Sequence, residues 1–594
     1  MDSETKVCQN CKKDFVIEPD DFSFYEKMKV PPPTFCPKCR LARRLIWRNE
    51  RSLYKRACDL CKKSIISMHR PDAEFPVYCH DCFYGDGWDT LTYGRDYDFQ
   101  KPFFEQFKDL QRVVPRPASY SMQNVRSDYC NYTAHMKDGY LMFGSWFCEN
   151  CGYGQTILES KDCWDCLFTK NSEQCYASID CVKCNLTHFS EKCSDCYDSV
   201  FLFDCRNCQN CLFCTNLRNK NYHVFNQQVS KEEFEKTKRE IFASYGAFQK
   251  AFSDFRKLVR DKALHKFMTG DHNSNVSGEF IYQSKNVFDS YYINDGEREK
   301  YAVRGGKGQK DAMDVFGVHA GELAYECNNI DFSSRCLFSI NGENNLSSDY
   351  LVDSDHVSNS FGCISMRKKE FCILNKQYSK EEYETLRGKI IEHMNKMPYA
   401  DKKARTYAYG ELFPIELSPH SYNETLAQEY VPVTKTQAEE LGYSWYDSEE
   451  KSYTATKSWK DLPESIDAVG DDILLEVILC QAWDTDKTTA QQHKCSKAFK
   501  ITPNELAIYR KWNLPLPRKC PNTRNYELSL LRNSVNFYDR PCACAGAHSQ
   551  NGAYQNTAKH SHGDSHCPNK FKTSYAPNRP ETVYCEECYK SEVV

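Results

Sequence analysis

The 34 cysteines of this 594-residue chain follow two different spacing rules, and the contrast limits what the chain can fold into. Near both ends they occur in Cys-x-x-Cys motifs at distances typical of metal-binding turns. In the middle, fourteen cysteines are separated by multiples of three residues. The first rule predicts metal sites, and the second predicts a stacked repeat with a small-residue interior. The fourteen are Cys130, Cys148, Cys151, Cys163, Cys166, Cys175, Cys181, Cys184, Cys193, Cys196, Cys205, Cys208, Cys211 and Cys214.

The N-terminal ligands form two pairs of Cys-x-x-Cys turns. One turn directs two thiolates at one point, and two turns complete a closed tetrahedral zinc site. The turns of the first pair are 24 residues apart and those of the second 17, the latter within the zinc-ribbon range. We therefore predict two structural zinc ions with no open position for catalysis. Their ligands are Cys8, Cys11, Cys36 and Cys39, and Cys58, Cys61, Cys79 and Cys82.

The segment that joins these two sites is strongly basic. Residues 36–63 contain ten basic and two acidic side chains, and residues 41–56 are predicted to form a helix that carries Trp47 and Tyr54. A basic face with aromatic side chains is typical of nucleic-acid binding. The alternative is a solvated helix balanced by acidic neighbours such as Glu18. The candidate phosphate contacts are Arg43, Arg44, Arg48, Arg51, Lys55 and Arg56.

The N-terminal module recurs near the C-terminus at an offset of 484 residues. Residues 22–39 match residues 506–523, and Arg48-Asn49 matches Arg532-Asn533. The first site of this copy is eroded, because Gln492 and Thr523 stand where Cys8 and Cys39 stood. Cys495 and Cys520 remain, and either Cys480 or His493 could complete the set.

The last site of the copy has more candidate ligands. Ala545 stands opposite Cys61, but a thiolate quartet of Cys542, Cys544, Cys585 and Cys588 is predicted. A histidine-rich loop adds Cys567, His560 and His562, together with His548 and His566. A structural site with a spare ligand is favoured, and a reactive open metal site is the alternative. The chain is thus expected to bind two zinc ions, and up to four.

The central repeat of three residues fits neither an amphipathic helix nor an ordinary strand. A tight β-helix whose coils hold a whole number of triplets fits it. Cysteine separations of 12 and 18 recur almost equally, so coil length and hand stay open. A second, fainter block shares one phase of Cys327, Cys336, Cys363 and Cys372.

Both blocks end on the same phrase. Residues 214–235 parallel residues 363–384, with Asn226 and Asn375 in register. Ser230 and Ser379 each precede Lys-Glu-Glu, as helix N-caps do. We expect each coil stack to stop where a helix caps it.

Three roles are open to the central cysteines. Stacked thiols about 4.8 Å apart can bind soft metals or take part in redox chemistry. In-register parallel side chains, however, do not readily reach disulfide geometry. Inert packing is favoured, since buried cysteine behaves as a small hydrophobe.

The whole chain is predicted to be mixed and mainly β, with terminal zinc-ribbon modules flanking a two-block cysteine-rich β-solenoid and with connecting and capping helices. The predicted segments are a tandem zinc-ribbon module (1–90), a helical linker (91–126), solenoid block 1 (127–229), a helical connector (230–278), solenoid block 2 (279–378), a mixed linker (379–475) and a degenerate zinc-ribbon module (476–594). Residues 103–114 and the phrase TKTQAEELGY are predicted to be helical.

Composition narrows the class of protein. The net charge of −4 gives no overall preference for polyanions, so nucleic-acid binding would need a local patch. The N-terminus lacks a secretory signal, and no apolar run is long enough to span a bilayer. We expect a cytoplasmic protein with reduced thiols and no membrane contact. Nucleotide-binding loops, catalytic triads and other motifs for a small-molecule substrate are absent from the sequence.

Several phrases resemble a known family. FCPKCR with its upstream FYEK and three prolines, and YRKWNLPLPRKCPN in the copy, resemble the "probable zinc-ribbon" domain of uncharacterised bacterial proteins, many of them from candidate-phylum lineages. The phrases CILNKQYSKEEYE and YGELFPIELSPHSYNETLAQEY are similar to those long cysteine-rich proteins too. The resemblance implies zinc binding and no established reaction.

Three functional hypotheses follow. The first is a non-enzymatic zinc protein that recognises nucleic acid, with RNA favoured, through its basic N-terminal module. The second is a protein-interaction scaffold that binds no nucleic acid. The third is a metal-dependent enzyme at the C-terminal Cys/His cluster.

Overall fold

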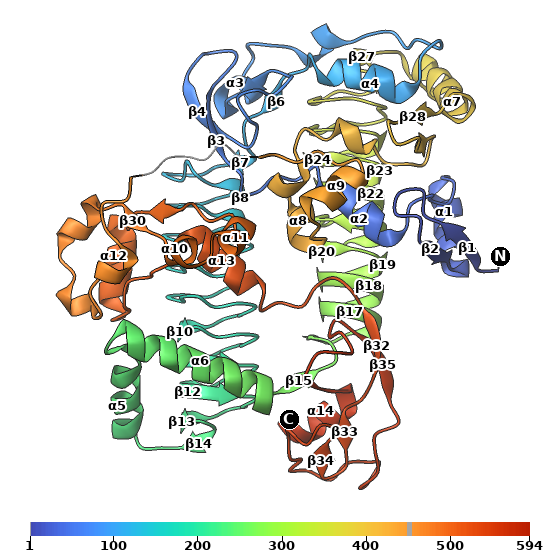
Figure 1. Ribbon diagram of the computed structural model, residues 1–594. Coiled ribbons are helices and arrows are strands. Elements are labelled where there is room, and N and C mark those ends of the chain that lie inside the picture. Colours follow the sequence, from blue (N-terminus) through green and yellow to red (C-terminus); the bar gives the residue numbers. More distant parts are fainter. Residues whose placement is uncertain (1, 448–453) are drawn as a thin grey trace. The chain divides into compact units, whose positions relative to one another are not determined.

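The computed structural model describes residues 2–447 and 454–594, and the chain divides into two compact units. The first unit comprises Met1–Tyr120, Met268–Asp447 and Ser534–Phe537, and the second comprises Ser121–Phe267, Ser448–Asn533 and Tyr538–Val594. Neither unit follows the predicted linear boundaries, since each combines a stretch of parallel pairing with segments from a terminal module (Figure 1).

The first unit is mainly β. Its N-terminal elements are β1 (Glu4–Val7), β2 (Asp14–Ile17), α1 (Pro19–Met28), α2 (Pro37–Leu45), β3 (Tyr54–Ala57), β4 (Ser64–Ser67), β5 (Val77–Tyr78), α3 (His80–Tyr84), α4 (Phe103–Gln111) and β6 (Arg116–Pro117). Its parallel sheet contains β16 (Gly270–Asp271), β17 (Ser274–Tyr282), β18 (Lys285–Asn294), β19 (Glu297–Lys300), β20 (Val303–Gly306), β21 (Lys310–Phe316), β22 (Glu322–Asp331), β23 (Ser334–Leu337), β24 (Ile340–Glu343) and β25 (Leu346–Asp349). The hairpin of β26 (Cys372–Ile373) and β27 (Lys376–Gln377) follows, then α7 (Lys380–Lys396), β28 (Tyr399–Ala400), β29 (Thr406–Tyr407), α8 (Leu426–Tyr430) and α9 (Lys435–Glu440).

In the second unit the parallel strands come first in sequence and the cysteine-bearing terminal segment follows, which is the reverse of the first unit. Parallel pairing comes first, in β7 (Ser121–Met122), β8 (Asn131–Ala134), β9 (Phe143–Trp146), β10 (Asn185–His188), β11 (Tyr197–Phe203), β12 (Gln209–Thr215) and β13 (Asn221–Val224), and β14 (Gln227–Gln228) closes it. Next come α5 (Lys231–Phe242), α6 (Tyr245–Lys262) and β15 (Leu264–Lys266). The C-terminal elements are β30 (Ile478–Leu479), α10 (Gln481–Thr485), α11 (Lys487–Gln492), β31 (Ala498–Phe499), α12 (Pro503–Lys511), α13 (Pro521–Ser529), β32 (Tyr538–Pro541), β33 (Cys544–Ala545), β34 (His548–Ser549), β35 (Lys570–Thr573), β36 (Thr582–Tyr584) and α14 (Glu586–Val593).

Parallel pairing advances by twelve residues in each unit, which resolves the choice between 12 and 18. In the second unit Glu149 pairs with Lys161, and Lys161 pairs with Glu173. We call the segment 121–224 the first ladder and the segment 270–373 the second ladder. The second ladder also advances mainly by twelve. Its steps are eleven between β16 and β17 and at the start of the pairing of β17 with β18, and thirteen where β19 and β20 pair with β21.

The period of three arises from the backbone. From residue 123 to residue 225 every third residue except Tyr129 has φ between 42° and 59°, in the left-handed region. Each triplet therefore places one side chain inward, pairs the next residue with the neighbouring strand and turns a corner at the third. Asn and Asp tolerate the left-handed conformation better than other side chains with a Cβ, and they occupy corners such as Asn150, Asp162 and Asn207. Four such triplets make up one twelve-residue step.

Cysteines fill the inward positions of the first ladder. All fourteen are at most 3% exposed and form one buried cluster with Met136, Met142, Ile157 and Leu202. Their thiols donate to backbone carbonyls, as Cys163 Sγ does to Lys161 O at 3.4 Å and Ser172 O at 3.5 Å. Each side of a coil holds only two residues between corners, so the interior of the coil is narrow and suits small side chains.

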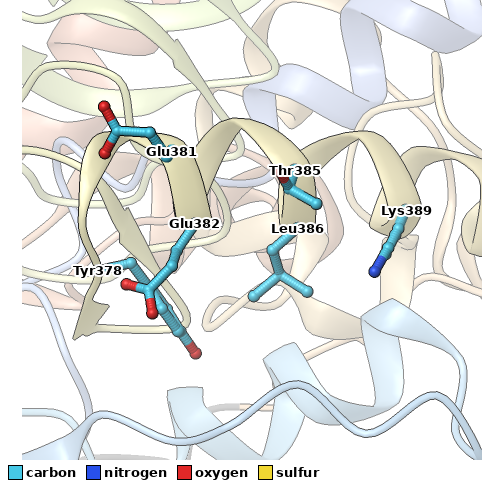
Figure 2. Close-up of a pocket in the computed structure, with 6 residues that line it drawn as sticks. All are labelled: Tyr378, Glu381, Glu382, Thr385, Leu386 and Lys389. Carbon is cyan, nitrogen blue, oxygen red and sulfur yellow. The ribbon is translucent and has the colours of Figure 1, made fainter.

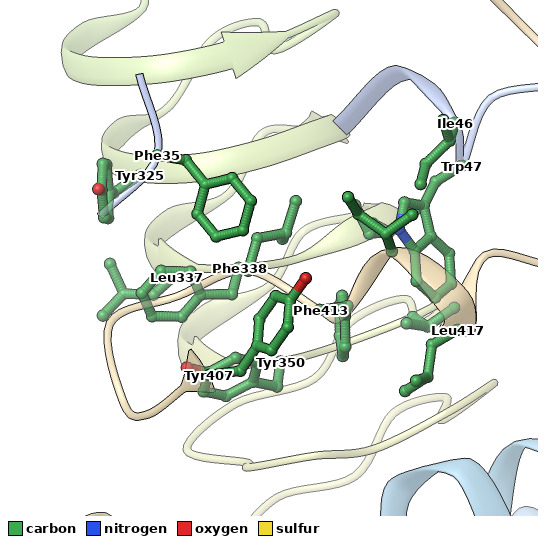
Figure 3. Packing of buried hydrophobic residues seen from close by; sticks show 14 of the residues in the cluster. Phe35, Ile46, Trp47, Tyr325, Leu337, Phe338, Tyr350, Tyr407, Phe413 and Leu417 are labelled. Atoms are coloured by element: carbon green, nitrogen blue, oxygen red, sulfur yellow. The ribbon is translucent and has the colours of Figure 1, made fainter. Parts of the chain in front are cut away.

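An aromatic layer joins the second ladder to the segments around it (Figure 3). Phe338 directly follows β23 and Tyr350 directly follows β25, and their rings stack at 4.7 Å between centres. Tyr350 also meets Phe413 at 5.7 Å. Phe413 in turn packs against Trp47, just after α2, at 5.1 Å. This layer fixes α2 and residues 407–417 against the ladder.

Both ladders end as the repeated phrase predicts. The side-chain amide of Asn226 donates to Thr215 O and accepts from Thr215 N, and Asn375 bonds Ile364 in the same way. Ser230 then caps α5 and Ser379 caps α7 through their hydroxyls. The expectation that a helix follows each stack is confirmed.

One helix prediction was too long, and two others were close. The helix expected over 41–56 is α2, which ends at Leu45, and residues 54–57 form strand β3 instead because they pair with β4 in a hairpin. The helices expected at 103–114 and at TKTQAEELGY are α4 and α9. Among the described residues, no helix combines the length and the apolarity that crossing a membrane requires.

Candidate metal centres

The first two cysteine groups are assembled as predicted. The first group is Cys8, Cys11, Cys36 and Cys39, and the second is Cys58, Cys61, Cys79 and Cys82. In each group the four sulfur atoms lie within 4.8 Å of one another. A tetrahedral zinc with 2.3 Å bonds needs sulfurs about 3.8 Å apart, and the Cys11–Cys36 and Cys61–Cys79 pairs lie at 3.7 and 3.8 Å.

Both groups are built on the same backbone turn. The hairpin β3–β4 carries Cys58 and Cys61, and it closes where Cys58 N donates to Lys63 O at 2.8 Å. Cys79 is the N-cap of α3, and its N–H donates to Cys58 Sγ at 3.3 Å. In the first group the corresponding distances are 2.9 Å for Cys8 N to Lys13 O and 3.2 Å for Cys36 N to Cys8 Sγ. The second ligand thus lies two residues before the carbonyl that closes the turn.

The fourth group corrects the predicted quartet. The sulfurs that come together are those of Cys542, Cys567, Cys585 and Cys588, whereas Cys544 lies outside the group. The reason is an insertion in the hairpin, because Cys542 N donates to Asn569 O at 2.9 Å and Cys567 lies two residues before that carbonyl. Cys567 therefore takes the place of Cys61, with 24 residues between it and Cys542 where two residues lie between Cys58 and Cys61.

The third group follows the same rule with three cysteines. Cys480 N donates to Lys497 O at 2.8 Å, and Cys495 lies two residues before that carbonyl. Cys520 caps α13 and donates from its N–H to Cys480 Sγ at 3.2 Å. Thr523 occupies the fourth position, with its Oγ1 3.3 Å from Cys520 Sγ. Of the two candidates to complete this site Cys480 does so, and His493 instead stacks on Tyr526.

A fifth group mixes cysteine with histidine. Cys544, His560, His562 and Cys588 place one ligand atom each within 4.8 Å of one another. The two histidines that the sequence offered as candidates thus belong with Cys544, while His548 and His566 lie outside every metal-compatible group of the described residues. Cys588 belongs both to this mixed group and to the fourth group.

The basic segment does not form the predicted phosphate-contacting face. Arg43 and Arg44 are both fully buried. Arg43 binds Glu326 and Glu411 at 2.7 Å each, and Arg44 binds Asp314 at 3.1 Å. Their carboxylate partners lie some 270 to 370 residues further along the chain. The sequence around the helix therefore gave no sign that these arginines are paired.

The other four basic candidates differ in exposure. Arg48 is 2% exposed and donates to Asn329 at 2.6 Å, so it cannot contact a phosphate backbone either. Arg51 and Arg56 are half-buried, and Arg56 binds Asp59 at 2.8 Å. Lys55 is exposed. Nucleic-acid binding stays a prediction, without the arginine face on which it was based.

The second unit repeats this docking with its own residues. Arg40 binds Asp314 at 2.8 Å, and Arg524, which is 484 residues later, binds Asp165 at 3.0 Å. Asp165 and Asp314 are 149 residues apart, as are the phrases that end the two ladders. Both aspartates occupy left-handed corners of their ladders.

Two further contacts obey the same pair of offsets. The ring centres of Tyr25 and Tyr325 lie 5.6 Å apart, and those of Tyr509 and Tyr176 lie 5.8 Å apart. Arg48 reaches Asn329, and Arg532 binds Asp180 at 3.2 Å. In each unit, therefore, the module packs on its ladder through equivalent side chains.

The ladder cysteines have the properties of packed thiols. None of the five metal-compatible groups of the described residues includes a cysteine of either ladder. Burial raises the pKa of Cys130 and of Cys327 to about 12, and it raises the pKa of Cys336 as well. These three protonated thiols are poor nucleophiles and poor ligands. Elsewhere in the first ladder, hydrogen bonds with neighbouring thiols lower the pKa of Cys163, Cys184 and Cys208.

A surface pocket of about 460 Å³ lies beside α7 (Figure 2). Its lining consists of Tyr378 and of α7 residues between Glu381 and Lys389, so a single segment forms it. None of the predicted ligands lines this pocket, and the metal-compatible groups remain the candidate functional sites.

Comparisons with known proteins add little. No family model and no curated protein matches the chain. Among solved structures, a crystal structure of a "putative acetyltransferase" from Desulfovibrio desulfuricans G20 matches 46% of this chain and 74% of its own with 9% identity. The TM-score of 0.09 carries no argument about fold or function.

Proposed function

We propose that this chain is a zinc-braced, non-enzymatic scaffold in which two β-solenoids are each covered by a pair of zinc-ribbon modules. The observation that carries the proposal is the repeated docking of module on ladder through Arg40–Asp314 and Arg524–Asp165. Buried arginines that hold a module onto a rigid stack are structural, and they direct the modules inward rather than towards a ligand.

The chemistry of the ligands supports zinc. Thiolate quartets favour zinc or iron–sulfur clusters, and hairpin-plus-helix turns of this kind are typical of structural zinc. Four thiolates saturate a tetrahedral ion, so the first, second and fourth groups would hold zinc without an open position for substrate. The resemblance to the "probable zinc-ribbon" domain points the same way.

The zinc ions would act as folding braces. The hairpins that carry the first two groups have strands of only four residues, too short for independent stability. Metal binding to such small modules supplies folding free energy directly. The solenoid faces that the modules leave uncovered would then bind partners, in a cytoplasm that keeps the thiols reduced.

Metal content tests the proposal. We expect purified full-length protein to hold at least three zinc ions, and Cys11→Ser or Cys61→Ser to lower the content by one ion each. Cys181→Ser, which changes a buried thiol of the first ladder, is the matched control and should leave the zinc content unchanged. Protein without zinc, or an equal loss from Cys181→Ser, would contradict the proposal.

A shift assay separates the scaffold from an RNA-binding protein. The scaffold predicts no binding of single-stranded RNA at 50 mM salt. Binding that weakens steeply between 50 and 200 mM salt and is lost in a Lys55→Glu/Arg56→Glu variant would instead support nucleic-acid recognition.

A further inference from the structure

We propose that the fourth group and the mixed group form one two-ion centre, in which the thiolate of Cys588 bridges two zinc ions. The inference rests on the zinc binding proposed above for the fourth group and adds a second ion to it. Cys588 lies in the first turn of α14 and is 2% exposed. Its sulfur lies within 4.8 Å of the ligand atoms of both sets.

The number of ligands requires a shared atom. The two sets contain seven different residues, whereas two tetrahedral ions need eight bonds. A thiolate has enough lone pairs to bind two metals at once, so a bridging Cys588 supplies the missing bond. Both coordination spheres are then complete, one with four sulfurs and the other with two sulfurs and two nitrogens.

His560 is arranged as a metal ligand. Its side chain is 2% exposed, and its Nε2 lies 2.9 Å from the buried carboxylate of Glu592. Its Nδ1 is buried and has no hydrogen-bond partner. If Nε2–H donates to Glu592, Nδ1 has a free lone pair, and this pairing of carboxylate with histidine is the usual support of a metal-bound imidazole. A buried imidazole nitrogen without a partner is costly unless it binds something.

His562 is oriented in the complementary way. Its Nδ1 lies 2.7 Å from Ser565 O, which can only accept, so the proton is on Nδ1. Its Nε2 therefore presents a lone pair, and it lies 3.4 Å from Cys588 Sγ. This separation matches a sulfur and a nitrogen bound to the same zinc, with bonds of about 2.3 and 2.0 Å.

The balance of charge also favours two ions. Cys542, Cys544, Cys567, Cys585 and Cys588 are all buried. Five thiolates around one divalent ion would leave three buried negative charges, whereas two ions leave one. Uncompensated buried charge is expensive, so the second ion stabilises the set as a whole.

The second set of ligands comes from the insertion in the hairpin. Cys544, His560 and His562 all lie between Cys542 and Cys567, where the second group has only two residues. Residues 543–566 thus separate the two cysteines of the turn and also bring three further candidate ligands within 4.8 Å of Cys588 Sγ. The third group has an insertion at the same point, but it gains no additional ligands there.

The test counts metal ions and measures their coupling in the full-length chain. In a His560→Ala/His562→Ala variant we expect one zinc ion fewer per chain than in wild type, while the fourth group stays loaded. After cobalt replacement, the wild type should show magnetic coupling between two ions, and X-ray absorption of the zinc form should show a metal–metal distance of about 3.8 Å, from 2.3 Å bonds and a tetrahedral angle at sulfur.

Control variants separate this inference from the proposed function. Cys61→Ser should lose one ion from the second group and keep both the coupling and the metal–metal distance. An unchanged zinc count in the double histidine variant would overturn the bridge. The bridge would also be overturned if that variant lost an ion but the wild type showed neither magnetic coupling nor a metal–metal distance. Absence of zinc from every variant would instead overturn the proposed function.

Discussion

Glu299 gives the sharpest test of how the second ladder is packed. This residue of β19 points inward between Val287 and Ala312 of the neighbouring strands and is 1% exposed. Both of its carboxyl oxygens are buried without a hydrogen-bond partner. Burial raises the pKa of Glu299 to about 8, because the ionised form would lose its hydration.

The sign of the pH effect follows from this pKa. The folded chain keeps the Glu299 proton up to pH 8, whereas the unfolded chain releases it near pH 4.5. Between these values the folded state holds one more proton, so the free energy of unfolding falls by about 1.4 kcal/mol per pH unit as pH rises. Integrated from pH 5 to pH 8, the loss is about 3.5 kcal/mol.

Glu299→Gln removes this titration, and we expect it to become more stabilising relative to wild type by about 3.5 kcal/mol between pH 5 and pH 8. Urea unfolding of both proteins at half-unit pH steps measures the difference, and common effects of pH on the metal groups cancel. Glu322→Gln on the exposed side of β22 is the matched control and should give a flat difference. A flat difference for Glu299→Gln as well would show that the carboxylate is solvated or paired, and would refute the inward placement.

Two further predictions concern the ends and the docking of the ladders. Asn375→Ala should lower the free energy of unfolding by about 2–4 kcal/mol, because it leaves the buried N–H and C=O of Ile364 unpaired. The side chain of Asn226 is exposed, so Asn226→Ala should cost less than half as much in the same urea titration. Arg524→Met should cost about 3–5 kcal/mol, because it removes the cation that pairs with the buried carboxylates of Asp165 and Glu505. Arg524→Met/Asp165→Asn should recover part of this cost, and a double variant no better than the single would refute the pairing with Asp165.

The repeated architecture was accessible from sequence, whereas its coil length was not. The common phase of the fourteen cysteines required a three-residue unit, and the shared phrase at Asn226 and Asn375 marked both ends. Cysteine separations alone could not choose between 12 and 18, because only some inward positions carry cysteine. The left-handed corners were a missed signal: Asn and Asp recur two residues after inward cysteines, as at Asn150, Asp165 and Asn207.

The metal ligands were predictable wherever the turn was intact. Cys58 and Cys61 lie in the turn of one short hairpin, and spacing alone found them. Cys567 was missed as a quartet member because the sequence comparison placed Ala545 opposite Cys61, and an insertion breaks any fixed offset. The usable signal was the return strand, since Cys567 precedes β35 as Cys61 precedes β4.

The arginine helix shows why a local charge count misleads. Ten basic and two acidic residues over 36–63 resemble a nucleic-acid face only if their partners are ignored. The partners Asp314, Glu326 and Glu411 lie on the second ladder and beyond it, and no local pattern marks them. The repeat contained the missing information: Arg40 and Arg48 recur as Arg524 and Arg532, whereas Arg43 and Arg44 recur as Glu527 and Leu528.

What differs between the copies indicates where a specific role would lie. Docking is kept in both units, down to Tyr25–Tyr325 and Tyr509–Tyr176. The candidate metal ligands differ between the units. In the third and fourth groups an insertion separates the first two cysteines, whereas the two groups of the first unit have no such insertion. A hairpin that is closed by the backbone bond two residues beyond its second cysteine can accept extra chain between its two cysteines and still keep them together. The insertion at 543–566 brings Cys544, His560 and His562 close to Cys588. If the proposed zinc scaffold is right, the fourth group is therefore where a role beyond structural bracing would lie.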